Sequence, residues 1–219
     1  MAFRLNRPAV TETPFFSEPP VWLLVAENAP ERTCIPLEHT ADGPVIRCFL
    51  SQFDAMIEAE LIARRSRMRY YAVPASEIDR ALFRAPRAAG FIAYLHVGWF
   101  ARSGRILLRL DGLPAGCHQP LRWSGSSAGY FEVDRCMLAM VERLHERAGL
   151  FAWRETLREV DDWGGARWAQ AQEQALRSLS GLSQDGEISA ANQLALFDPE
   201  AGQWHLVPID DAADCDDRS

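Results

Sequence analysis

The chain of 219 residues contains no lysine, so all 23 of its basic residues are arginine. Without lysine there is no Schiff-base lysine, no lysine general base and no P-loop lysine to hold nucleotide phosphates. This one absence therefore excludes several classes of enzyme. Arginine codons displace lysine codons in genomes rich in G and C, and we accordingly expect a bacterial source of that kind.

Paired cysteines, a leader sequence and a long apolar run are missing as well. The cysteines, at positions 34, 48, 117, 136 and 215, include no CxxC pair, and their odd number suits reduced thiols better than disulfides. The N-terminus has no charged-then-apolar leader, and no apolar run approaches the roughly 18 residues of a membrane span. We therefore expect a cytoplasmic protein with no membrane contact, no metal and no cofactor.

Charge is distributed unevenly along the chain, which carries a net charge of -7. Residues 60–110 hold ten arginines and three acidic residues, whereas residues 180–219 hold one arginine and nine acidic residues. The overall negative charge opposes general attraction to nucleic acid or to an anionic membrane. A partner is therefore expected to be a protein, acidic where it meets the basic segment 60–110.

Hydrophobic periodicity predicts an α+β fold. A mixed or antiparallel sheet is expected from residues 21–113, with a helix over 52–66 packed on one face. Ser51 and Asp54 approximate a capping box at the start of that helix. A helical segment over 133–180 and a C-terminal β-hairpin should follow.

The ends of the chain differ in composition from this central domain, residues 21–180. Residues 1–20 carry four of the 13 prolines and are expected to form an extended arm. Residues 181–208 should comprise a linker and the terminal hairpin. The acidic residues 209–219 contain too few hydrophobic side chains to pack, and we expect them to be disordered.

Alternation along the strands predicts a binding face within the basic segment. Side chains two residues apart share a face, so Arg69 accompanies Tyr71, and Tyr94 accompanies His96. If the strands adjoin, one face gathers arginines that bind carboxylates and aromatic rings that add rigid contact area. The predicted partner-binding residues are Arg69, Tyr71, Tyr94, His96, Arg105, Arg109 and Trp123. The competing interpretation is that these arginines only solvate an exposed surface.

Three functional hypotheses follow. The leading one is a non-enzymatic bacterial interaction protein, either a toxin-neutralising immunity protein or an adaptor, with no catalytic residue. The second is an enzyme with an unusual site at Cys117, His118 and Ser124, within a loop predicted over the Pro-, Gly- and Ser-rich residues 114–130. The third is a nucleic-acid-binding module that uses the basic segment 60–110.

Overall fold

The computed structural model describes residues 13–29, 32–66, 68–124, 129–185 and 188–209. The helices are α1 (Gln52–Ala63), α2 (Arg80–Ala89), α3 (Arg135–Arg147), α4 (Trp153–Asp161) and α5 (Gly165–Leu182), with 3-10 turns η1 (Ala75–Glu77) and η2 (Ile188–Ala190). The strands are β1 (Phe15–Phe16), β2 (Trp22–Ala29), β3 (Arg32–Cys34), β4 (Glu38–Thr40), β5 (Gly43–Phe49), β6 (Arg69–Pro74), β7 (Ile92–Arg102), β8 (Arg105–Leu108), β9 (Gly116–Pro120), β10 (Arg122–Ser124), β11 (Tyr130–Glu132), β12 (Ser183–Asp185), β13 (Gln193–Asp198) and β14 (Gln203–Pro208).

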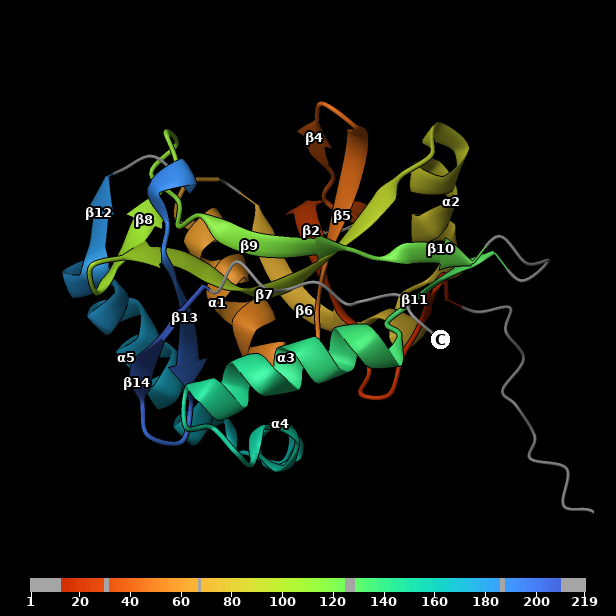
Figure 1. Cartoon of the computed structure of the whole chain (residues 1–219). Coiled ribbons are helices and arrows are strands. Elements are labelled where there is room, and N and C mark those ends of the chain that lie inside the picture. The colour runs from red at the N-terminus through yellow and green to blue at the C-terminus, as the bar shows by residue number, and fades with distance from the viewer. Residues whose placement is uncertain (1–12, 30–31, 67, 125–128, 186–187, 210–219) are drawn as a thin grey trace, which may run out of the picture.

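Most of these strands join one mixed sheet. Its central order is β12-β8-β7-β5-β2-β3, with β4 on β5, β6 on β2, and both β9 and β13 on β7. The pairs β5–β7 and β12–β8 are parallel, and the hairpin β13–β14 is antiparallel. The predicted α+β fold with a mixed sheet and a C-terminal hairpin is therefore confirmed. That hairpin is part of the main sheet, because β13 pairs with β7 (Figure 1).

The sheet is covered by helices on both faces. Cys48 and Leu95 are paired between β5 and β7 and belong to the same apolar cluster as Val141 of α3. The next residue of β5, Phe49, points to the opposite face and packs with Ala55 of α1. Helices α1 and α3 therefore lie on opposite sides of the sheet (Figure 1).

Helix α1 matches the predicted helix and is fixed at its start by its own sequence. The Ser51 hydroxyl accepts a hydrogen bond from the backbone N–H of Asp54 at 3.1 Å, which is the expected capping interaction. Among the described helices, none combines the length and the apolar character needed to cross a membrane.

Within the predicted extended arm, residues 13–20 include a strand that packs against the rest of the chain. Strand β1 pairs with β11 in a second sheet, ordered β1-β11-β10. Phe15 is buried there, stacking on Phe131 with ring centroids 5.6 Å apart. Burial of this aromatic side chain stabilises an extended segment that has few local contacts of its own. The predictions for residues 1–12 and for the acidic tail from 210 lie outside the described residues.

The predicted loop over 114–130 is largely strand. Strand β9 pairs with β7 along residues 94–99, and β10 follows almost at once. Cys117 and Leu121 are buried, so among the described residues of this range the glycines and prolines flank strands and do not mark a surface loop. Strand β8 ends at Leu108, because Arg109 N–H donates to the carbonyl oxygen of Leu113 at 2.8 Å and closes a turn.

Candidate functional site

The strand register does not assemble the predicted basic and aromatic face. Strands β2 and β5 lie between β6 and β7, and their pairing sets the orientation of each side chain. Tyr71 is paired with Val25, whose side chain packs in the same cluster as α3. The ring of His96 lies 5.2 Å from that of Phe49, on the α1 side of the sheet. Arg69 and Tyr71 therefore face one side, and Tyr94 and His96 the other.

The remaining predicted residues are also dispersed. Arg105 is exposed at the β7–β8 turn. Arg109 lies in the turn after β8, with ion pairs to Glu38 at 3.0 Å and to Asp111 at 2.8 Å. Trp123 stands on β10 in the second sheet and is 49% exposed. A role in partner binding stays a prediction for each of these residues, but no single face contains them all.

Two predicted residues, Arg109 and His96, take part in a polar cluster beneath α1 that strand alternation did not reveal. At its centre, Arg47 pairs with Glu38 at 2.6 Å and with Glu58, which is 3% exposed. Burial raises the pKa of Glu58 even though Arg47 opposes the rise. Burial also acts on Glu38, but Arg47 and Arg109 outweigh it and lower the pKa of that carboxyl. Two arginines and two glutamates neutralise one another, so this cluster stabilises the fold and leaves little net charge for a ligand.

Three rings next to this polar cluster, from His96, His118 and Trp99, continue it into the sheet. His96 lies 4.4 Å from Trp99 and 5.3 Å from His118, measured between ring centroids. Gly116 makes room for the histidines, since a Cβ atom there would lie 2.6 Å from His118 Cε1. Burial lowers the pKa of His118 to about 4, and burial with His118 and Arg47 holds the pKa of His96 well below its usual range. Both side chains are therefore neutral at neutral pH.

The proposed cysteine chemistry finds no support in the geometry. Cys117 is 9% exposed, and burial raises the pKa of its thiol to about 11. A nucleophilic cysteine needs the opposite, an accessible thiol with a lowered pKa. With His118 neutral and hard to protonate, this pair lacks the charged partner that would stabilise a thiolate.

Helix α2 carries the clearest basic surface, and the sequence prediction missed it. Arg80, Arg84 and Arg87 are spaced by four and three residues, so they share one face, and all are exposed. Phe83 and Pro86 are buried on the other face. The spacing of the three arginines is visible in the sequence, but no helix over all three residues was predicted. In the structure α2 continues through Pro86 to Ala89.

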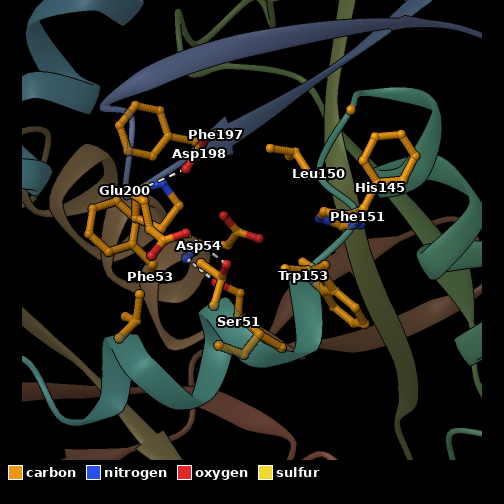
Figure 2. Close-up of a pocket in the computed structure, with 16 residues that line it drawn as sticks. Ser51, Phe53, Asp54, His145, Leu150, Phe151, Trp153, Phe197, Asp198 and Glu200 are labelled. Carbon is orange, nitrogen blue, oxygen red and sulfur yellow. Dashed lines mark hydrogen bonds between the residues drawn. The ribbon is translucent and has the colours of Figure 1, made fainter.

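A pocket of about 180 Å³ lies apart from both the polar cluster and α2. It opens between the start of α1, the α3–α4 connection and the β13–β14 turn. Figure 2 shows Asp54 and Ser51 between two walls, one with Phe53, Phe197, Asp198 and Glu200, the other with His145, Leu150, Phe151 and Trp153. Ser51 and Asp54 were predicted only as a helix cap. Asp54 therefore both follows the cap and lines a pocket.

Comparison with known proteins adds no assignment, because no protein-family model, no curated protein and no solved structure matches this chain.

Proposed function

We propose that this chain is a non-enzymatic interaction protein of the bacterial cytoplasm, in the manner of an immunity protein or an adaptor, and that α2 provides its main contact with an acidic partner. One observation carries the proposal: Arg80, Arg84 and Arg87 form an exposed stripe on a helix that contains no acidic residue. Arg84 and Arg87 have no ion pair with any described residue, so their charge is available to a partner. Guanidinium groups bind carboxylates in a forked, directional geometry that suits such a contact.

The helix that carries this stripe is held in place by an N-terminal cap and by apolar packing. The Asp79 carboxylate accepts a hydrogen bond from Ala81 N–H at 2.8 Å and caps the helix. Phe83 packs in the main apolar cluster with Ile78, and its ring lies 6.3 Å from that of Phe15. A rigid helix loses little conformational entropy when it binds, which favours affinity.

Several arginines elsewhere are occupied by contacts within the chain. Arg154 pairs with Glu142 and Arg177 with Glu173, while Arg167 lies 3.7 Å from the centre of the Trp163 ring. Unlike these three arginines, Arg84 and Arg87 share one face of a helix that contains no acidic residue, so their positive charges add. Nucleic acid is the second candidate, but three arginines on a protein of net charge -7 favour a local protein contact.

The test is a charge reversal at the centre of the stripe. We expect the tagged protein to capture one stoichiometric partner from its native host, and Arg84→Glu with Arg87→Glu to weaken that complex by at least about tenfold, because like charges then face each other. The control is Arg143→Glu, which alters an exposed residue of α3 and should leave binding unchanged. Equal binding by all variants would overturn the proposal. Capture that disappears with nuclease treatment, with affinity that falls steeply between low and high salt, would favour nucleic acid instead.

A further inference from the structure

We propose that the pocket beside Asp54 binds an organic cation whose head group carries N–H, either an ammonium or a guanidinium. The described residues that line this pocket include the carboxylates of Asp54, Asp198 and Glu200, and no arginine. The excess of carboxylates in the lining therefore favours a positively charged ligand. This site shares no residue with α2, so it is independent of the proposed protein contact and fails or succeeds separately.

Asp54 is the carboxylate left open to a ligand. Asp198 Oδ1 accepts two backbone N–H groups of the β13–β14 turn at 2.9 and 3.1 Å, and Glu200 Oε2 accepts the hydroxyl of Thr156 at 3.1 Å. Within the described chain, the Asp54 side chain has no such partner, although its backbone N–H donates to Ser51. A sheltered carboxylate without a donor is unfavourable, and an N–H cation would supply both charge and hydrogen bonds.

His145 adds a second acceptor without adding charge. Its side chain is 8% exposed, and its Nδ1 lies 2.8 Å from the carbonyl oxygen of Val141. In that geometry Nδ1 carries the proton and donates it, which leaves Nε2 as a lone-pair acceptor at the pocket wall. Burial lowers the pKa of His145 to about 4, so the ring is neutral at neutral pH and does not repel a cation.

Aromatic rings form the rest of the site and limit the size of its ligand. Phe53 and Phe197 stack with centroids 5.4 Å apart on one side, and the His145 ring stacks on Trp153 at 4.6 Å on the other. Phe151, 80% exposed, stands at the mouth. Ring faces attract cations, and a cavity of about 150 Å³ holds a molecule as large as benzene. A volume of about 180 Å³ therefore suits a charged head group on a short alkyl chain.

Calorimetric titration of the whole chain with n-butylammonium and n-butylguanidinium tests the proposal. We expect saturable binding of at least one probe, no binding of neutral 1-pentanol, and a loss of about tenfold or more in Asp54→Asn. Asp162→Asn, a matched change of an acid outside the pocket, should bind like the unaltered chain. The absence of saturable binding, equal binding by Asp54→Asn, or equal binding of the neutral probe would each overturn the proposal.

A measurement on the unaltered chain tests the role of Asp54 even if the Asp54→Asn variant does not fold. Burial raises the pKa of Asp54 to about 7, so lowering the pH from about 8.5 to about 5.5 should weaken cation binding about 30-fold as the carboxylate is protonated. A pH-independent affinity would contradict the role of Asp54. A competition experiment identifies the source of the cation. If a short peptide with a single lysine displaces the probe, the natural ligand is a protein side chain. If the peptide does not compete, the natural ligand is a free amine. Both results support the site.

Discussion

A single arginine, Arg47, bridges two glutamates that belong to different elements. It contacts Glu58 on α1 and Glu38 on β4, and only 15% of its side chain is exposed. Removing a charge from water is costly, so the arginine and its glutamates are stable there only as a set. The cluster therefore links α1 to the sheet, and its disruption should lower the free energy of unfolding.

Glu58→Ala should lower the free energy of unfolding by about 3 kcal/mol, because it leaves the Arg47 guanidinium buried with one partner fewer. Urea denaturation monitored by tryptophan fluorescence measures the change. Glu60→Ala, which removes only the exposed pair with Arg64, is the control and should cost less than about 0.5 kcal/mol. Equal effects of the two substitutions would mean that the buried pair contributes no more than the exposed one.

The four cysteines that the structure describes should separate into two groups when they are labelled with a maleimide. Cys34 and Cys136 are exposed, whereas Cys48 and Cys117 are buried and burial raises the pKa of both thiols. Because the thiolate is the reacting species, positions 34 and 136 should label in the native protein and positions 48 and 117 only after denaturation. Peptide mapping distinguishes the sites. Rapid native labelling of Cys117 would restore the enzyme hypothesis.

At the scale of the element, β7 serves as the strand to which most of the molecule attaches. It pairs with β5, β8, β9 and β13, and it is irregular between His96 and Gly98 where β9 lies alongside. Gly98 has a φ of 140°, a conformation that side chains rarely adopt. A Cβ atom there would lie 2.9 Å from Leu196 Cδ2 and 3.1 Å from the carbonyl oxygen of Ala195. This glycine therefore lets β13 approach β7.

Gly98→Ala should destabilise the protein by about 2 kcal/mol, through backbone strain together with the clash against β13. Thermal and urea unfolding check this value. Gly164→Ala is a suitable comparison, because nothing lies within 4 Å of the added atom, and it should change stability by less than about 0.5 kcal/mol. Similar unfolding midpoints for the two variants would show that β13 can shift away from β7 without cost.

At the scale of the whole molecule, buried histidines make stability depend on pH. Burial lowers the pKa of His118 and of His145 to about 4, below the value of 6.5 in an unfolded chain. The unfolded state therefore binds more protons between these limits, so stability falls as the pH decreases from about 6.5 to about 4. Asp54 acts in the opposite direction, since burial raises its pKa from 3.8 to about 7 and the folded state gains a proton first.

Asp54→Asn should consequently make the acid-induced loss of stability steeper. One proton corresponds to about 1.4 kcal/mol per pH unit, and the variant loses a proton uptake by the folded state that opposes the histidines between about pH 4 and pH 7. Urea unfolding at several pH values gives the slope for each protein. Parallel pH profiles would show that Asp54 titrates alike in the folded and unfolded states.

Many of the individual elements were predictable because their signals are local. Ser51 and Asp54 mark the start of α1, and strand β2 and the hairpin of β13 and β14 are indicated by short apolar runs. Local signals could not reveal the contacts that a distant partner decides. Phe15 is ordered by Phe131, more than a hundred residues away, and β9 forms because an edge of β7 accepts it.

The basic stripe on α2 and the pairing of Arg47 with two glutamates illustrate the same division for function. The spacing of Arg80, Arg84 and Arg87, the lack of lysine and the excess of arginine over residues 60–110 are properties of the sequence alone. Which face each strand residue occupies, and whether an arginine meets a glutamate, depend on the pairing of strands far apart in the chain. Local propensity determined the elements. Tertiary register, set by burial of both faces of the sheet, separated Tyr71 from His96 and brought Asp54 together with His145.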